Sequence, residues 1–206
     1  MKKSIFFLFL LAACTGNEFN PKWTKEKAPD VFLVQFETSK GNFEAEINKH
    51  LSPLAVDRFY QLVKHDYFSN AIFYRVVPNF VAQFGNSDSS EIKNWIEYKI
   101  PDEKVIGSNE KGTISFARDG KDSRNVELYI NLEDNLFLDT IFYNEVKGFP
   151  VIGKVTQGMD TVEALYDGYG DKTMEKLETF YQRRSEFLRT YSSLDSILKI
   201  KIIRLK

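Results

Sequence analysis

Residues 73–85 read FYRVVPNFVAQFG, a run of β-branched and aromatic residues that contains one cation, Arg75. The pattern predicts two strands, broken after Val77. In regular strand geometry Arg75 and Val77 share one side, and Tyr74 and Val76 share the other. Charged side chains seldom lie in such apolar surroundings unless they are paired or functional. From this stretch alone, Arg75 is either a rim residue of an amphipathic strand pair or a functional group.

Apolar and polar residues also alternate on both sides of this stretch, which predicts further strands. Together with the two strands of residues 71–85, the predicted strands are 31–38, 43–48, 112–117, 126–132, 149–155 and 197–205. Most are joined by short turns, and a closed antiparallel barrel with helices over its ends accommodates this number of strands. The predicted fold is therefore mostly β, a closed eight-stranded antiparallel barrel.

Helical signals occur in three places. Residues 52–64 predict a helix with Ser52 as N-cap and proline at the first helical position. A shorter helix is predicted to end at Leu165, and these two helices are expected to cap the barrel. Residues 167–193 are interpreted as an extra helical insertion, and residues 86–111 as a long loop. The apolar residues of the insertion near helical spacing are Met174, Leu177, Tyr181, Leu188 and Tyr191.

The composition limits the classes of function. The chain has 206 residues, of which 43% are hydrophobic and 15% aromatic, so it can form one domain with a sizeable core. The net charge is -1, and no basic run is interleaved with aromatics, so no nucleic-acid partner is expected. His50 and His65 stand apart, and Asp119 and Asp122 lack the spacing of a calcium loop. We therefore expect no metal and no cofactor.

The N-terminus has the features of an export signal. Lys2 and Lys3 precede an apolar run at residues 5–11 that is too short to span a bilayer, so residues 1–13 are predicted to be a signal peptide. Residues 11–14, LAAC, resemble the signal box of bacterial lipoproteins. The resemblance implies cleavage before Cys14 and lipidation of that cysteine. The alternative is an ordinary signal peptide with an incidental cysteine.

Residues 14–30 are mostly polar and show no periodicity, so they are predicted to be a flexible tether between the lipidated cysteine and a domain at 31–206. Thr15, rather than an aspartate, follows the cysteine, which favours the outer membrane. The expected location is the cell envelope, with the domain anchored to a bacterial membrane and facing the periplasm or the exterior.

With these residues laid out, the chain resembles the cyclophilin-type peptidyl-prolyl cis-trans isomerases. The resemblance covers about residues 31–166, resumes at 194–205, and implies a cyclophilin-like barrel. Five segments carry it in order: 73–83 (FYRVVPNFVAQ), 112–117 (GTISFA), 128–131 (LYIN), 136–139 (LFLD) and 151–160 (VIGKVTQGMD).

The resemblance also implies site residues, position by position. The catalytic residues are Arg75, Phe80 and Gln83. The substrate-binding residues are Val81, Ala117, Glu127, Tyr129, Phe137, Leu138 and Phe149. The aromatic and aliphatic side chains near Phe80 would form a slot for proline. Gln83 would hold the turning carbonyl, and the backbone of Ala117 would bind the residue before proline.

The chain departs from the family pattern at a few positions. Glu127 stands where the family usually has glutamine, which affects how a substrate backbone is held. Phe84 replaces a glycine after the signature and is expected to stiffen the loop there. Phe149 stands where relatives have histidine or tyrosine. Tyr129 takes a phenylalanine position, so its hydroxyl must find a partner or water.

The chemistry implied by the resemblance needs neither a nucleophile nor a cofactor. An X-Pro amide rotates slowly because resonance gives its C–N bond partial double-bond character. In the twisted state the prolyl nitrogen regains a lone pair, to which a guanidinium can donate, so Arg75 would stabilise the transition state selectively. The predicted function is a monomeric isomerase that acts on proline-containing polypeptides and assists the folding of exported proteins. The alternatives are a membrane-anchored proline-peptide binding or chaperone module with little activity, and a scaffold that docks a partner through residues 167–193.

Overall fold

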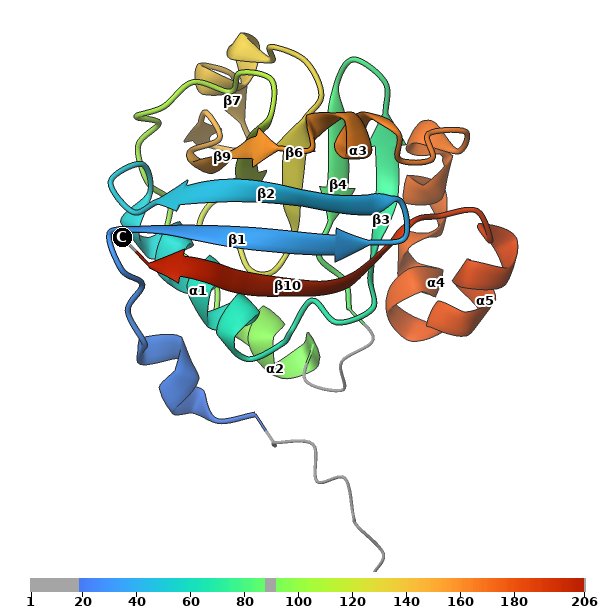
Figure 1. Ribbon diagram of the computed structural model, residues 1–206, viewed down its shortest axis with the longest axis horizontal. Helices are drawn as coiled ribbons and strands as arrows, with labels where there is room; N and C mark the ends of the chain where they lie inside the picture. Colours follow the sequence, from blue (N-terminus) through green and yellow to red (C-terminus); the bar gives the residue numbers. More distant parts are fainter. Residues whose placement is uncertain (1–18, 88–91, 206) are drawn as a thin grey trace, which may run out of the picture.

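The protein forms a closed antiparallel barrel in a computed structural model that describes residues 19–87 and 92–205 (Figure 1). The predicted signal peptide and Cys14 lie outside the described residues. Eight strands follow the order β1-β10-β3-β4-β6-β5-β9-β2 around the barrel, which confirms the predicted fold class. The barrel strands are β1 (Val31–Thr38), β2 (Gly41–Asn48), β3 (Ala71–Val77), β4 (Val81–Phe84), β5 (Thr113–Phe116), β6 (Leu128–Asn131), β9 (Val151–Gln157) and β10 (Ser196–Leu205).

Short helices and one small hairpin surround the barrel. The α-helices are α1 (Pro53–Lys64), α2 (Ile92–Glu97), α3 (Met159–Glu163), α4 (Leu177–Gln182) and α5 (Arg184–Thr190). The 3₁₀ helices are η1 (Pro21–Lys25), η2 (Leu136–Asp139) and η3 (Gly170–Lys176), and the hairpin pairs β7 (Phe142–Tyr143) with β8 (Val146–Lys147). No helix in the described ranges is long and apolar enough to cross a membrane.

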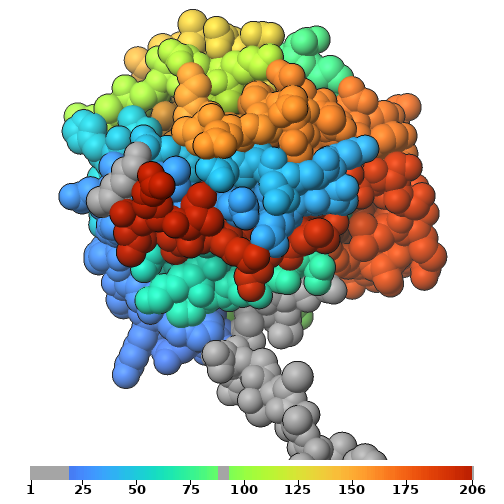
Figure 2. All heavy atoms as spheres, in the orientation of Figure 1, coloured from blue at the N-terminus to red at the C-terminus, as the bar shows by residue number. Residues whose placement is uncertain are grey.

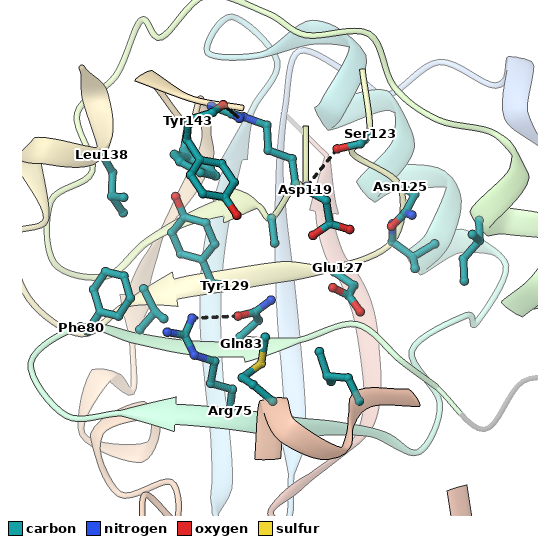
Figure 3. Close-up of a pocket in the computed structure, with 18 of the residues that line it drawn as sticks. Arg75, Phe80, Gln83, Asp119, Ser123, Asn125, Glu127, Tyr129, Leu138 and Tyr143 are labelled. Carbon is teal, nitrogen blue, oxygen red and sulfur yellow. Dashed lines mark hydrogen bonds between the residues drawn. The ribbon is translucent and has the colours of Figure 1, made fainter. Parts of the chain in front are cut away.

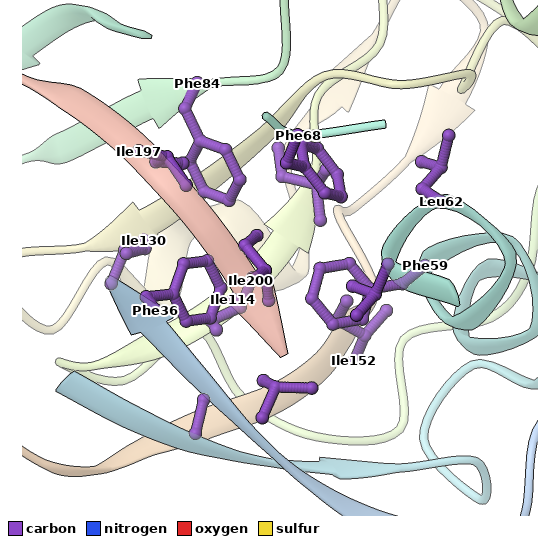
Figure 4. Close-up of a cluster of buried hydrophobic side chains, with 14 of the residues drawn as sticks. Phe36, Phe59, Leu62, Phe68, Phe84, Ile114, Ile130, Ile152, Ile197 and Ile200 are labelled. Atoms are coloured by element: carbon purple, nitrogen blue, oxygen red, sulfur yellow. The ribbon is translucent and has the colours of Figure 1, made fainter. Parts of the chain in front are cut away.

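The barrel interior is filled largely by phenylalanine and isoleucine side chains (Figure 4). Phe36 stacks on Phe43 at 4.3 Å between ring centroids, and Phe84 meets the edge of Phe36 at 5.9 Å. Phe84 is fully buried in this core. The sequence placed Phe84 in a loop after the signature, whereas it is the last residue of strand β4 and its side chain packs in the barrel core.

Helix α1 begins at the predicted position, but its N-terminus is capped differently. The Ser52 side chain makes no hydrogen bond to the helix backbone and donates instead to Glu103. The Glu103 carboxylate accepts the backbone N–H groups of Leu54 and Ala55 at 2.8 and 3.1 Å. The buried Arg124 guanidinium holds the same carboxylate at 3.0 Å. The long segment before β5, predicted as a loop, therefore supplies the helix cap and also contains α2.

Strand β3 does not alternate regularly, because its pairing with β4 shifts register between Phe73 and Arg75. Phe73 and Val76 both lie in the barrel core, whereas Tyr74 lies in a separate cluster with Phe180. The predicted sharing of one side by Tyr74 and Val76 is therefore wrong. A β-bulge changes which residues point inward, and it lets Tyr74 and Arg75 both stay outside the main core.

The insertion packs on the outside of β3. Its small core combines the strand residues Ile72 and Tyr74 with Phe180, Phe187 and Tyr191. Figure 1 shows α4 and α5 together at one side of the barrel, and Figure 2 shows the orange-red residues of this region as a continuous block there. The predicted helical insertion is thus broken into η3, α4 and α5, which are docked against the barrel.

The segment before β1 also packs on the body. Trp23 of η1 stacks on His65 at 4.0 Å between ring centroids, and Phe19 meets the edge of Trp95 at 5.1 Å. Glu26 accepts a hydrogen bond from His65 at 3.0 Å. From Phe19 onward the chain therefore differs from the flexible tether predicted for residues 14–30, because aromatic contacts that depend on distant residues hold it in place.

Candidate active site

A cavity of about 660 Å³ lies between the barrel and the insertion (Figure 3). Of the ten residues predicted to form the site, nine line this cavity: Arg75, Phe80, Val81, Gln83, Ala117, Glu127, Tyr129, Leu138 and Phe149. The tenth, Phe137, does not line it. Its side chain is 53% exposed, and its ring stacks on that of Phe80 at 6.1 Å between centroids. The structure therefore places Phe137 behind Phe80 at the rim rather than in the slot.

Among the described residues, Arg75 is one of two arginines that line the cavity, and its orientation is fixed by several contacts. Its Nη1 donates to Oε1 of Gln83 at 3.2 Å, across the pair of strands β3 and β4 (Figure 3). The guanidinium carbon lies 5.3 Å from the ring centroid of Phe80, within the range of a cation–π contact. Nε donates to Oδ1 of Asp171 at 2.6 Å. Because Gln83 and Phe80 also line the cavity, these contacts hold the guanidinium at its edge.

An apolar slot lies next to Arg75. Val81, Tyr129 and Leu138 are buried together, and the partly buried residues Phe80, Ala117 and Phe149 pack against them. The Tyr129 hydroxyl finds the partner that the sequence required, because it donates to Oδ1 of the fully buried Asn109 at 3.0 Å. The slot thus presents rings and aliphatic groups to a ligand while its one polar tip is satisfied below the surface.

Glu127 is engaged by two tyrosines. Its carboxylate accepts a hydrogen bond from the Tyr74 hydroxyl at 3.1 Å and another from the Tyr181 hydroxyl. Burial raises the pKa of Glu127, while the two hydrogen bonds act in the opposite direction. Burial also raises the pKa of Tyr74 well above its ordinary value. The two tyrosines therefore remain hydroxyl donors, and both carboxylate oxygens are occupied before any ligand arrives.

Sequence reasoning missed Arg118, which lies directly after Ala117. Its guanidinium donates to the carbonyls of Tyr143, Val146 and Gly148 at 2.8, 3.0 and 2.9 Å. The same group lies 4.2 Å from the ring centroid of Phe149. Arg118 thus ties the β7–β8 hairpin to the slot. The only sequence signal was a cation at the start of the charged loop at residues 118–125.

The insertion also contributes to the cavity in a way that the sequence did not predict. Met174, Leu177 and Tyr181 of the insertion line the cavity together with residues of the barrel. Their spacing predicted a helix, but nothing in the spacing showed which surface the helix would cover. The site therefore has a barrel side and an insertion side.

Among the described residues, those that line the cavity combine a cation, an amide and an apolar surface. Arg75 provides a fixed cation, Gln83 an amide, and the slot an apolar surface for a ring. No group of three or more His, Cys, Asp or Glu residues in the described ranges is arranged to hold a metal ion. The arrangement suits the binding and polarisation of a neutral polar group attached to a small apolar ring.

Comparisons of the sequence with known proteins identify the family. Residues 33–181 match the family described as cyclophilin type peptidyl-prolyl cis-trans isomerase/CLD. A peptidyl-prolyl cis-trans isomerase of Acinetobacter baylyi is 33% identical over 135 residues, which cover 65% of this chain and 71% of that protein. Peptidyl-prolyl cis-trans isomerase A of Dickeya dadantii is 32% identical over 149 residues, which cover 71% of this chain and 76% of that protein.

The fold is similar to that of a solved structure. The crystal structure of a cyclophilin type peptidyl-prolyl cis-trans isomerase from Cryptosporidium parvum aligns with a TM-score of 0.59 at 17% sequence identity. The alignment covers 85% of this chain and 99% of that chain. At this identity the likeness supports the barrel fold alone.

Proposed function

The chain belongs to the cyclophilin-type peptidyl-prolyl cis-trans isomerase family, and we propose that it assists the folding of exported proteins by isomerising their X-Pro bonds, with Arg75 stabilising the twisted prolyl amide. One observation carries the role of Arg75. Its guanidinium is held by Gln83 and Phe80 at the edge of the apolar slot.

The mechanism follows from the electronic structure of the amide. Rotation about an X-Pro bond faces a barrier of about 18–20 kcal/mol, because the planar amide is stabilised by resonance. When the bond twists, the prolyl nitrogen becomes pyramidal and can accept a hydrogen bond. Arg75 can donate to that nitrogen in the twisted state and hardly at all in the planar state, so it lowers the barrier selectively. Its charge is permanent and its donors are planar, which suits this role.

The other residues bind and orient the substrate. Val81, Tyr129, Leu138 and Phe149 hold the proline ring away from water. Gln83, already bonded to Arg75, holds the carbonyl that turns. The backbone of Ala117 pairs with the residue before proline. No covalent intermediate is formed, and no proton changes place.

The test is an isomerisation assay with a proline peptide on residues 19–206, which keep Phe19 and its contact with Trp95. Removal of one preorganised donor costs about 10²-fold or more in rate in other enzymes, and we expect a loss of that order for Arg75→Ala. Arg183→Ala is the matched control, because Arg183 is an exposed arginine of the insertion that pairs with Glu186 at 2.8 Å. An Arg75→Ala variant with an intact circular dichroism spectrum and an unchanged rate would refute the proposed role.

A binding module with little catalytic activity is the second candidate, and the state of Glu127 favours it. Both of its oxygens already accept tyrosine hydroxyls, and a carboxylate has no N–H to donate to a substrate carbonyl, whereas a glutamine amide has. The same assay separates the two functions. A protein that binds the proline peptide in a calorimetric titration, but does not accelerate its isomerisation, is a binder.

We also propose that the protein acts as a monomer at the cell envelope, anchored through a lipid on Cys14 after removal of residues 1–13. The support is the LAAC sequence after an apolar run, and Thr15 favours the outer membrane. Two or more acyl chains give stable anchoring. Cys14→Ser should release the full-length protein from bacterial membranes. A variant that still sediments with the membranes would contradict the anchor.

A further inference from the structure

One acidic residue of the insertion, Asp171, contacts Arg75 directly. Asp171, in η3, accepts a hydrogen bond from Nε of Arg75 at 2.6 Å. The Arg75 side chain is 20% exposed and that of Asp171 is 67% exposed. Asp171 is not among the residues that line the cavity.

Asp171 completes the set of contacts that fixes the guanidinium plane. A guanidinium has five N–H donors in one rigid plane, so two hydrogen bonds and one ring contact define its position. Gln83 binds Nη1, Phe80 lies against the guanidinium face, and Asp171 binds Nε. Among the described residues, Nη2 has no hydrogen-bond partner. Its donors therefore remain for a ligand in the slot.

The segment that carries Asp171 is itself anchored to the barrel. Phe180 packs on Tyr74 at 5.6 Å between ring centroids, next to Arg75 in β3. Arg184 donates to the carbonyls of residues 70 and 86, which flank β3 and β4. The Tyr191 hydroxyl donates to the carbonyl of Lys172 at 3.0 Å and so ties η3 to the end of α5. A carboxylate on such a frame can restrain an arginine, whereas one on a free loop could not.

We propose that Asp171 is a positioning residue for Arg75, and that the helical insertion is therefore part of the catalytic apparatus. This inference rests on the proposed function. Asp171 touches neither the proline slot nor a substrate. It holds Nε so that Nη2 points at the position of the prolyl nitrogen. Without it, the arginine samples other side-chain conformations, and a smaller fraction of bound substrate meets a donor. The loss should fall on kcat, whereas KM reflects the unchanged slot.

The experiment measures kcat and KM for isomerisation of a proline peptide. We expect Asp171→Ala and Asp171→Asn to lose about five-fold in kcat, the effect of an exposed ion pair. Asp171→Glu, which keeps the charge, should recover part of the rate. The matched control is Glu110→Ala, because Glu110 is an exposed acid that pairs with Lys154 at 2.8 Å, and its kcat should not change. In an Arg75→Ala background, Asp171→Ala should have no further effect.

A spectroscopic readout supports the kinetics. The Nε–H of Arg75 should give a protected NMR signal in the wild type and in Glu110→Ala, and lose its protection in Asp171→Ala. An Asp171→Ala variant with wild-type kcat would overturn the inference, as would an equal loss in Glu110→Ala or a change in KM alone. If Arg75→Ala is as active as the wild type, the proposed function fails and this inference fails with it. If Arg75→Ala has a reduced kcat and Asp171→Ala has the kcat of the wild type, only this inference fails and the proposed function stands.

Discussion

Tyr181→Phe tests how the insertion is joined to the barrel, because it removes a single hydroxyl. That hydroxyl donates to Glu127, which also accepts from Tyr74 at 3.1 Å. A hydrogen bond to an ionised group contributes about 1.5–3 kcal/mol to the free energy of unfolding. The Tyr181 side chain is 48% exposed, so water can replace part of the lost bond. We therefore expect the lower end of that range, about 1.5 kcal/mol, at neutral pH.

The same substitution should show a pH dependence with a defined sign. Burial raises the pKa of Glu127 above its ordinary value of 4.5, and the hydrogen bonds from Tyr181 and Tyr74 lower it in part. Loss of the Tyr181 hydroxyl raises the folded-state pKa further and leaves the unfolded-state pKa unchanged. The folded variant then binds a proton more tightly than the folded wild type. The loss of stability caused by Tyr181→Phe is therefore largest at pH values above the Glu127 pKa of both folded proteins. It becomes smaller as the pH falls through these two pKa values.

Urea unfolding of both proteins at neutral pH and at about pH 4 measures this difference. Tyr143→Phe is the matched control, because Tyr143 also lines the cavity and its hydroxyl has no hydrogen bond among the described residues. Its free energy of unfolding should change by no more than about 0.5 kcal/mol. Equal destabilisation of Tyr181→Phe at the two pH values, or a loss no larger than that of the control, would refute the reasoning.

Three further substitutions test the support of the fold and the slot. Burial alone would raise the pKa of Asp57. Hydrogen bonds from the side chains of Lys49 and Lys27 and from the backbone N–H of Ala28 instead hold this pKa below its ordinary value of 3.8. Asp57→Asn should therefore lose stability above that pH, and its deficit should shrink as acid protonates the wild-type carboxylate, which urea titrations will measure. Arg124→Ala should cost about 3–5 kcal/mol in thermal or urea unfolding, because it leaves the Glu103 carboxylate, whose side chain is only 13% exposed, without its counter-ion. Tyr129→Phe should lower the free energy of unfolding by about 1 kcal/mol and leave the isomerisation rate unchanged.

Most of the barrel could be predicted from local patterns. The strand predicted at 31–38 is β1, whose residues alternate between half-buried and buried along its whole length. Helix α2 was missed for a physical reason. It has only six residues, and Trp95 within it is held by rings from Phe19 and Trp23, far away in sequence. A helix that depends on such contacts leaves no periodic signal of its own.

Most residues of the site could be predicted from the resemblance. The resemblance placed nine of the ten residues on the cavity. Four of them lie in barrel strands (Arg75, Val81, Gln83 and Tyr129), and the other five lie in turns or short segments outside the strands. Phe137 does not line the cavity, although Leu138, the next residue of η2, does. Consecutive side chains of a 3₁₀ helix point in different directions, so the resemblance identified the segment but not which of its side chains faces the slot. Tyr74 was misplaced because a β-bulge leaves no signature in the alternation of β3. Asp171 could not be recognised at all, since an exposed aspartate in a polar segment resembles any solvated residue.

The substitution at Glu127 and the presence of the insertion are best understood as one change. A carboxylate only accepts hydrogen bonds, so a half-buried Glu127 needs donors that the family's glutamine does not. Tyr74 supplies one from β3, and Tyr181 supplies the other from α4. The insertion is also held on the barrel by its packing against Tyr74. In this position its Asp171 binds Arg75. Loss of the insertion would therefore leave Glu127 with a single tyrosine donor, expose the ring of Tyr74 and release the Nε of the arginine in the same step.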